Sequence, residues 1–328
     1  MGAICQTTLL AGSFLVFLYG IVPLLLYMFP NIELSLIFMS AVNWPFTNYS
    51  DPRAYGVKYD SRNFYLSSSD GVKLGVWHML PKSLHKSSVL NERGFDTVFD
   101  DERYPVVLYF HGNTWSRCAS HRIQLYNIFT ELNYHVVTFD YRGFADSTGS
   151  ASEEGMNKDA HTVYQWIRTH SNRTAVLLWG HSLGTAVATR FAADLCLSGN
   201  CPLGLVLEAP FNNMFDAVKN HPFTSMYRWH PWFAEIFTYP LLKYNVHFKS
   251  DEHIKNVYCP ILILHAEDDN IIPSHLARRL HEAALSADRD STFKEFSRTK
   301  KYGHKFIVRE PELPTITKNF VKKCTSGI

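Results

Sequence analysis

The chain has almost no excess of either charge, because 32 lysines and arginines are balanced by 30 aspartates and glutamates among its 328 residues. Nucleic-acid binding needs a basic surface, and this composition does not provide one. Six cysteines are too few and too scattered for a disulfide framework, and no pair has the spacing of zinc ligands. Internal repeats are also missing. The length that remains fits one domain of about 250 to 280 residues with an appendage.

Charge is wholly missing from residues 9–29, which are almost all apolar. A helix of about 20 residues rises about 1.5 Å per residue and so crosses the roughly 30 Å hydrocarbon layer of a bilayer. We therefore predict one transmembrane anchor. A cleaved signal peptide is the alternative, but the run has no basic region before it and ends without small residues. Residues 34–46 are too short to span and predict an interfacial segment. This places an anchor region at 1–46 and a catalytic domain at 47–328.

The residues give conflicting signals about the compartment of that domain. Positive charge begins only after the anchor, at Arg53, and the positive-inside rule then favours the cytosol. Asn48 and Asn172 each begin an N-glycosylation acceptor tripeptide, which favours the lumen. Cys196 and Cys201 flank a Gly-Asn turn, and this spacing is compatible with a local disulfide and equally with two free thiols. The residues alone leave the orientation open.

Residues 175–184 form a short apolar strand that leads directly into the pattern G-x-S-x-G, and residues 186–195 continue as a helix. Strand, turn and helix in this order are the setting of a nucleophile elbow. A serine hydroxyl is a poor nucleophile until a base takes its proton, so the fold must hold the serine at an exposed, strained turn beside backbone N–H groups. The pattern predicts Ser182 as a catalytic nucleophile.

An elbow of this kind draws its acid from a later strand end. Residues 258–265 form a buried-strand run, and Asp269 follows it at the carboxyl edge where such sheets place their sites. Asp269 is the predicted acid. Asp268 is the neighbour most easily confused with it, although a turn carboxylate that caps the loop or the next helix explains it equally well. Glu208, at the end of another strand, is a weaker alternative.

The base should follow the last strand, on a loop that returns an imidazole over the elbow. His304 meets this condition, because it follows the strand pattern at 292–297 and precedes a helix at 311–323. His181 lies beside the nucleophile in sequence but faces away from it at an elbow. We therefore predict His304 as the base and a structural role for His181.

An oxyanion hole needs two backbone N–H donors, one from the residue after the nucleophile and one from the turn after the third strand. Leu183 supplies the first. The strand at 105–110 ends in His-Gly-Asn-Thr, so the amide of Asn113 or Thr114 is the predicted second donor. His111 is interpreted as part of the bend and not as a base.

Beyond the anchor, strand and helix patterns alternate along the chain. Residues 62–67 and 72–80 predict a hairpin around an Asp-Gly turn, and residues 155–169 predict a helix. Residues 81–104 are polar and interrupted, which predicts a surface loop. The alternation predicts an α/β fold with a mostly parallel sheet and helices on both faces.

Between the sixth and seventh strands, residues 211–253 are rich in aromatic side chains and predict a lid. Most of these rings are expected to form the core of a helical cap. Some must line the entry to Ser182, because the lid can cover the carboxyl ends of the strands. An apolar lid together with a membrane anchor predicts a lipid substrate, an acyl chain delivered from the bilayer.

Several motifs together carry a family resemblance: HGN at 111–113, DYRG at 140–143, GHSLGTAVATR at 180–190, LILHAEDD at 262–269 and YGHK at 302–305. Through them residues 55–320 resemble membrane-bound lipases of the α/β-hydrolase family that act on lysophosphatidylserine and monoacylglycerols. The resemblance implies an α/β-hydrolase fold and a triad at Ser182, Asp269 and His304. It also implies a domain in the endoplasmic-reticulum lumen, which favours the glycosylation acceptors over the charge bias.

In the resulting hypothesis, His304 is oriented by Asp269 and deprotonates Ser182, which attacks an ester carbonyl without any metal or organic cofactor. An acyl-protein thioesterase would use the same triad and anchor. A catalytically inactive, membrane-tethered binding module is a different class, and the complete triad argues against it. His135 and Asp140 have the H-x4-D spacing of acyltransferases, but they lie along one strand, so we interpret the spacing as coincidence.

The head-group preference is not specified by the sequence. Five basic residues could meet the phosphate and carboxylate of a lysophosphatidylserine, although each is more often a solvated surface charge: Arg142, Lys219, Arg228, Lys243 and Lys249.

Overall fold

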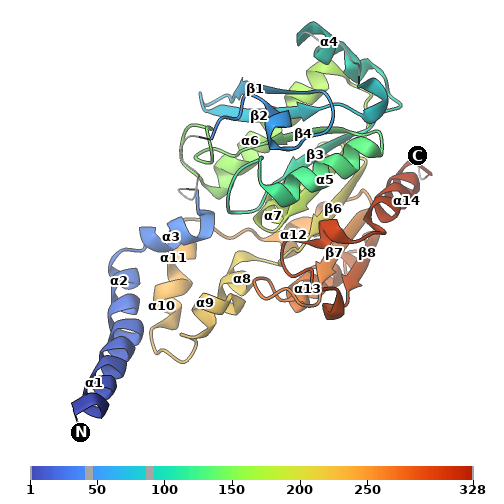
Figure 1. Ribbon diagram of the computed structural model, residues 1–328. Coiled ribbons are helices and arrows are strands. Elements are labelled where there is room, and N and C mark those ends of the chain that lie inside the picture. Colours follow the sequence, from blue (N-terminus) through green and yellow to red (C-terminus); the bar gives the residue numbers. More distant parts are fainter. Residues whose placement is uncertain (1, 41–46, 86–91, 327–328) are drawn as a thin grey trace.

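The computed structural model describes residues 2–40, 47–85 and 92–326, and its centre is an eight-stranded sheet with the order β1-β2-β4-β3-β5-β6-β7-β8 (Figure 1). The strands are β1 (Ser61–Ser67), β2 (Lys73–Met79), β3 (Val106–Phe110), β4 (His135–Phe139), β5 (Val176–His181), β6 (Gly204–Glu208), β7 (Ile261–Ala266) and β8 (Ser291–Phe296). β2 pairs antiparallel with both β1 and β4, and all the other pairs are parallel. The predicted fold class is confirmed.

Two hydrophobic clusters cover the two faces of the sheet, because side chains alternate along each strand. Leu178 of β5 belongs to the cluster that includes residues of α6 (Glu153–His170), α7 (Leu183–Leu197) and α13 (Ser274–Leu285). The next residue, Trp179, belongs to the cluster with α5 (Ser120–Glu131) and α14 (Leu313–Ser326). Since helices cover both faces, β3, β5 and β6 are buried along their whole length.

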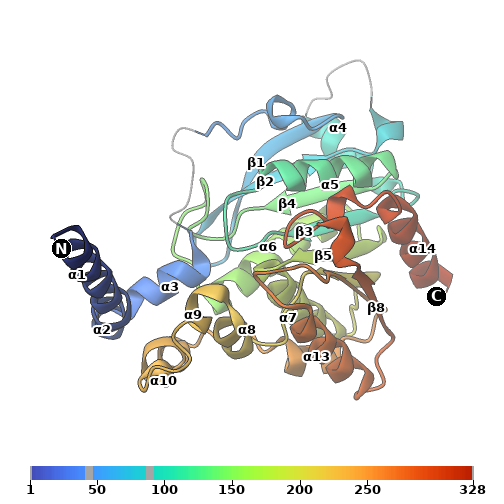
Figure 2. The ribbon, with the colours of Figure 1, turned by 60° about the horizontal axis from the view of Figure 1, so that its bottom comes forward.

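The amino-terminal region is a long helix that projects from the domain (Figures 1 and 2). It consists of α1 (Gly2–Val16), the π-helical turn η1 (Phe17–Ile21) and α2 (Val22–Met28), and Gln6–Met28 is long and apolar enough to span a membrane. The predicted segment at 9–29 begins three residues after the start of this span and ends one residue after its end. α3 (Asn31–Phe38) follows and covers part of the predicted interfacial segment. Residues 41–46 of that segment lie outside the described residues.

The lid consists of short helices between β6 and β7, and two of them, α10 and α11, lie beside α2 and α3 in Figure 1. They are α8 (Met214–Asn220), α9 (Pro222–Ser225), α10 (Phe233–Phe237), α11 (Tyr239–Lys243), α12 (Ser250–His253) and η5 (Ile254–Asn256). Other short turns are η2 (Pro52–Tyr55), η6 (Arg298–Lys300) and η7 (Ile307–Arg309).

The prediction of a surface loop at 81–104 is wrong for the described part of that segment. It forms η3 (Lys82–Leu84), α4 (Glu92–Thr97) and η4 (Val98–Asp100). Phe99 is fully buried, its ring stacks on the His78 imidazole at 4.5 Å, and its carbonyl accepts a hydrogen bond from the Thr174 hydroxyl. The segment has too few apolar residues to give a periodic pattern, so composition alone did not indicate its burial. The structure also joins Cys196 and Cys201 in a disulfide.

Candidate active site

Ser182 lies at the turn between β5 and α7, with φ of 53° and ψ of −122°. Positive φ strains any residue that has a Cβ atom. Two glycines make this turn possible: a Cβ atom on Gly180 would lie 2.6 Å from the Gly184 carbonyl oxygen, and one on Gly184 would collide with the Phe110 backbone. The close approach of α7 to β5 and β3 therefore requires glycine at both positions of the G-x-S-x-G pattern.

The structure brings Ser182, His304 and Asp269 together in one hydrogen-bonded chain. His304 Nε2 lies 2.8 Å from Ser182 Oγ, and His304 Nδ1 lies 2.7 Å from Asp269 Oδ2. Asp269 follows β7, and His304 follows β8 and η6. The three side chains meet because the carboxyl ends of parallel strands share one edge of the sheet.

Asp269 is held as an anion by its surroundings. Its Oδ1 atom accepts hydrogen bonds from the backbone N–H groups of Ile271 and Ile272, both at 2.9 Å. His265 Nε2 lies 3.4 Å from Oδ2. Burial would raise the pKa of Asp269, but the neighbouring imidazoles of His304 and His265 outweigh it and hold this pKa well below its ordinary value. Asp269 can therefore orient His304 and stabilise a charged imidazole.

The alternative residues have other contacts. Asp268 Oδ1 accepts from the N–H of Gly303, so this carboxylate fixes the loop that carries His304. The Glu208 carboxylate accepts from the Trp179 indole, and burial raises the pKa of Glu208 to about 7. His181 Nε2 lies 2.9 Å from the carbonyl oxygen of His304, and burial lowers the pKa of His181 to about 3. His181 is therefore neutral and holds the backbone of His304.

The turn after β3 is fixed by the buried guanidinium of Arg122, which sequence reasoning missed. Arg122 is 1% exposed and donates to the carbonyls of Ser116 at 2.6 Å and Thr114 at 2.7 Å, with a longer contact to Gly112. A planar trans peptide points its C=O and the following N–H in opposite directions. Because the Gly112 carbonyl faces Arg122, the N–H of Asn113 faces the other way. Asn113 also lines the pocket that contains Ser182, whereas Thr114 does not, so Asn113 is the better candidate for the second oxyanion donor.

His111 is a buried part of this bend, as the sequence indicated. Its Nδ1 atom lies 2.7 Å from the Gly112 carbonyl oxygen, and its Nε2 atom lies 3.3 Å from Asp140. Asp140 accepts its hydrogen bonds from the backbone N–H and the guanidinium of Arg117. Burial lowers the pKa of His111 well below its ordinary value, so the ring stays neutral. These contacts give Asp140, the aspartate of the H-x4-D pattern, a structural role without any acyltransferase activity.

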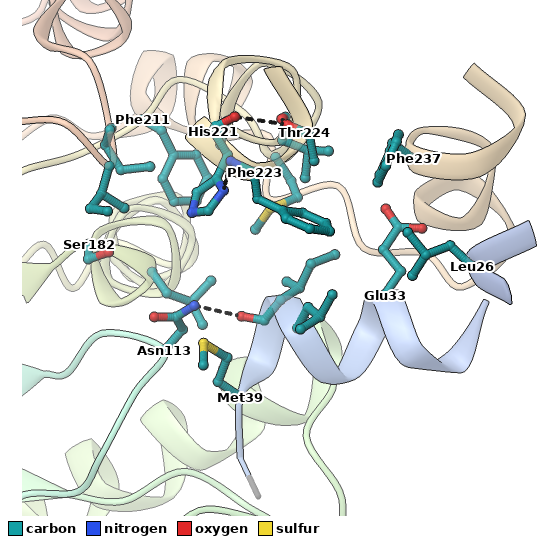
Figure 3. A pocket seen from close by; sticks show the side chains of 18 residues that line it. Leu26, Glu33, Met39, Asn113, Ser182, Phe211, His221, Phe223, Thr224 and Phe237 are labelled. Atoms are coloured by element: carbon teal, nitrogen blue, oxygen red, sulfur yellow. Dashed lines mark hydrogen bonds between the residues drawn. The ribbon is translucent and has the colours of Figure 1, made fainter. Parts of the chain in front are cut away.

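An apolar pocket of about 340 Å³ opens from Ser182 (Figure 3). Its walls come from the elbow, the lid and α3, and Ser182 and Glu33 lie at opposite ends of the view in Figure 3. The side-chain Nδ2 of Asn113 donates to the Ile37 carbonyl at 3.0 Å and so ties the oxyanion turn to α3. No pattern in the residues indicated that the segment after the anchor would form a wall of the pocket.

No lysine or arginine lines this pocket among the residues that the structure describes. Arg142 instead pairs with Asp70 and with the buried Asp159, both at 2.8 Å. Arg228 Nε donates to the backbone carbonyl of Lys219. The structure therefore brings none of the five basic head-group candidates into the pocket.

Known proteins are similar in sequence to this chain over most of its length. A family model described as serine aminopeptidase, S33, matches residues 101–253. The lysophosphatidylserine lipase ABHD12 of Danio rerio is 39% identical over 316 residues, which cover 94% of this chain and 82% of the relative. The corresponding Xenopus tropicalis lipase is 41% identical over 320 residues, with the same two coverages. The chain belongs to the ABHD12 family.

Membership of the ABHD12 family, together with the serine aminopeptidase match, makes the chain a serine hydrolase. Human protein ABHD12B is 38% identical over 267 residues, or 80% of this chain and 72% of that protein. Solved structures share the fold at lower identity. An alpha-beta hydrolase from Vibrio vulnificus has a TM-score of 0.64 at 17% identity, covering 91% of this chain and 92% of its own. An esterase from Pyrococcus furiosus has a TM-score of 0.60 at 16% identity, covering 84% and 94%.

Replacing Arg122 with methionine is expected to lower kcat for ester hydrolysis about tenfold to a hundredfold, somewhat less than the loss of a whole oxyanion donor. Methionine fills the space but donates to none of the carbonyls in the turn after β3, so the Asn113 N–H loses its fixed direction. Steady-state kinetics on a water-soluble ester measure the effect, with Arg122→Lys expected to retain part of the rate. A folded Arg122→Met protein with wild-type kcat would contradict this role.

Glu33 is an unusual residue for an apolar wall. It is 4% exposed, and neither carboxylate oxygen has a hydrogen-bond partner among the described residues. Burial raises the pKa of Glu33 to about 8. An unpaired carboxylate would be costly to bury, so the side chain is expected to carry its proton near neutral pH.

Replacing Glu33 with glutamine is expected to make the stability of the folded chain less sensitive to pH. Glu33 holds its proton up to a pKa of about 8 when folded, against an ordinary value of 4.5. The wild-type protein therefore keeps its full stability below the lower value and loses part of it as pH rises from that value through the higher one. Thermal unfolding in detergent from about pH 5 to pH 9 tests this. Parallel curves for the wild type and the glutamine variant would refute it.

Proposed function

We propose that this serine hydrolase is a membrane-anchored lipase that cleaves the acyl ester of lysophospholipids, lysophosphatidylserine in particular, and of monoacylglycerols. The observation that carries the proposal is the hydrogen-bonded chain from Asp269 through His304 to Ser182, which ends in an apolar pocket walled by the lid and by the segment after the anchor. The ABHD12 relatives are lysophosphatidylserine lipases and support the head-group preference.

The proposed reaction has two halves. His304 Nε2 takes the proton of Ser182, whose Oγ atom attacks the ester carbonyl, and the N–H groups of Leu183 and Asn113 hold the oxyanion. His304 then gives the proton to the leaving glycerol oxygen. In the second half, His304 takes a proton from water, which attacks the acyl-enzyme, and returns that proton to Ser182 Oγ as the fatty acid leaves. Asp269 remains ionised and stabilises the imidazolium in both halves.

The pocket supports an acyl chain rather than a head group as its occupant. Its walls are mostly apolar, and among the described residues no lysine or arginine lies there to meet a phosphate. A charged head group without a partner would be costly in such a site. The substrate head group is therefore proposed to stay outside the pocket, at the level of the head groups of the surrounding lipids. The acyl chain of the substrate then lies between the lid and α3.

A lumenal orientation in the endoplasmic reticulum is proposed for the domain at 47–328. Asn48 and Asn172 are both exposed, as glycosylation requires. The Cys196–Cys201 disulfide fits an oxidising compartment. Both observations favour the lumen over the charge bias that begins at Arg53.

Fatty-acid release by the detergent-solubilised protein from a substrate panel tests the head-group claim. The panel compares lysophosphatidylserine, other lysophospholipids, a monoacylglycerol and an acyl-cysteine peptide of the same chain length. We expect the highest kcat/KM for the serine lysolipid. The highest value for the acyl-cysteine peptide would replace the proposal with an acyl-protein thioesterase, because such an enzyme needs the same triad and acyl pocket.

A further inference from the structure

The lid touches the anchor helix partway along its length. The Tyr227 hydroxyl donates a hydrogen bond to the Leu18 carbonyl at 3.2 Å, and the Tyr227 ring packs edge-on against Tyr19 with centroids 5.8 Å apart. The Trp229 ring lies 5.2 Å from the same tyrosine. Figure 1 shows the lid helices α9 and α10 alongside α2. The lid and the anchor are therefore packed together through aromatic side chains.

The position of this contact sets a depth. Leu18 lies ten residues before Met28, the end of the apolar span Gln6–Met28. At a rise of about 1.5 Å per residue, ten helical residues cover about 15 Å. The hydrocarbon layer is about 30 Å thick, so the contact lies well inside the membrane that this span would cross. A lid fixed at that level cannot remain in water.

The surface of the lid has the chemistry of a membrane contact. Trp229, Trp232 and Tyr239 are 66%, 59% and 62% exposed. Tryptophan and tyrosine are enriched where a protein meets the membrane interface, because their rings are apolar with one polar group. Arg228 on the same segment folds back and donates to the Lys219 carbonyl, so its charged group has a polar partner within the lid.

We propose that the lid tip, residues 223–242, inserts into the bilayer beside the anchor and opens the acyl pocket toward lipid. The pocket is lined by Leu26 of the anchor and by Phe223 and Phe237 of the tip. A substrate chain can then pass from the bilayer into the pocket without crossing water. This inference rests on the membrane anchoring in the proposed function, and its partner is the lipid bilayer itself.

The full chain in phosphatidylcholine vesicles tests insertion by activity. Trp232→Asp is expected to lower kcat/KM for a vesicle-borne monoacylglycerol about tenfold or more, because a carboxylate is costly at the membrane interface. Hydrolysis of a water-soluble short-chain ester should stay within about twofold of wild type, since Trp232 lies outside the proposed catalytic groups. The matched control is Tyr258→Asp, which removes a 56% exposed aromatic residue just before β7. This variant should leave both rates unchanged.

A spectroscopic measurement covers the case in which the aspartate variant alters the lid fold. A fluorophore is attached through Trp232→Cys or Tyr258→Cys, with the unsubstituted chain as the labelling blank. We expect nitroxide-labelled lipid to quench the probe at position 232 and aqueous iodide to quench the probe at 258. Iodide quenching at both positions, together with unchanged vesicle hydrolysis in Trp232→Asp, would overturn the inference.

Two controls separate this inference from the proposed function. Alkaline carbonate washing tests the anchor, and release of the wild-type chain from the vesicles would end both proposals. Hydrolysis of the water-soluble ester tests the active site independently of any membrane. If the protein is anchored and active but iodide quenches the probe at position 232, the lipase proposal stands and only lid insertion is rejected.

Discussion

Replacing Ser182 with alanine is expected to lower kcat for ester hydrolysis by about 10⁶-fold, the loss seen when the nucleophile is removed from other enzymes with this triad. The hydroxyl lies 2.8 Å from His304 Nε2, and no other group in the proposed mechanism can form the acyl-enzyme. The assay uses purified protein and a water-soluble ester, so membrane binding does not enter the result. Activity within tenfold of wild type would place the nucleophile elsewhere.

The control for this prediction comes from the backbone of the elbow. Alanine meets the same positive φ of 53° as Ser182, so the melting temperature of Ser182→Ala should be close to that of the wild type. Glycine adopts this conformation without strain, and a residue with a Cβ atom costs about 1–3 kcal/mol there. Ser182→Gly should therefore be inactive and more stable. A marked loss of stability in both variants would make the activity result uninformative about the nucleophile.

The second large effect is expected from Asp269→Asn, with a loss in kcat of about 10⁴-fold. The amide can keep the position of the carboxylate but favours the wrong tautomer of His304 and cannot stabilise its charged form. Asp268→Asn is the matched control. An asparagine Oδ1 can still accept from the N–H of Gly303, so we expect a loss of tenfold or less, about 1.4 kcal/mol. Equal losses in the two variants would contradict the assignment of Asp269 as the acid.

The strands and the triad residues could be predicted because their signals are local. The apolar run before Ser182 is long enough to identify β5, and the glycines around it identify the turn. Asp269 and His304 each follow a strand, and parallel topology brings such positions to one edge of the sheet. Three residues that are far apart in sequence were therefore predicted as one site from their positions relative to strands.

The walls of the pocket and the support of the oxyanion turn could not be predicted in this way. Glu33 and Ile37 line the pocket only because α3 packs under the lid. Arg122 lies on α5 and reaches the carbonyls of the turn after β3 through the tertiary fold. Their role depends on contacts between elements, for which the residue pattern of one segment carries no signal. The same reason explains the buried Phe99 in a segment predicted as a loop.

The contact between lid and anchor changes what the amino-terminal helix does in this account. An anchor that only tethers the domain would not need specific side-chain contacts with the lid or the pocket. Here Tyr19 packs on the lid, Leu26 lines the acyl pocket and the Ile37 carbonyl holds the Asn113 side chain. The anchor region is therefore part of the substrate site, and its removal is expected to alter the pocket as well as membrane binding.

The measurement that tests the central claim most directly is labelling of the vesicle-bound protein with a long-chain alkyl fluorophosphonate, followed by mass spectrometry of the modified peptide. We expect a single adduct on Ser182, no adduct in Ser182→Ala, and slower labelling when lysophosphatidylserine is present. An adduct on another residue, or no adduct on a folded wild-type protein, would contradict the account.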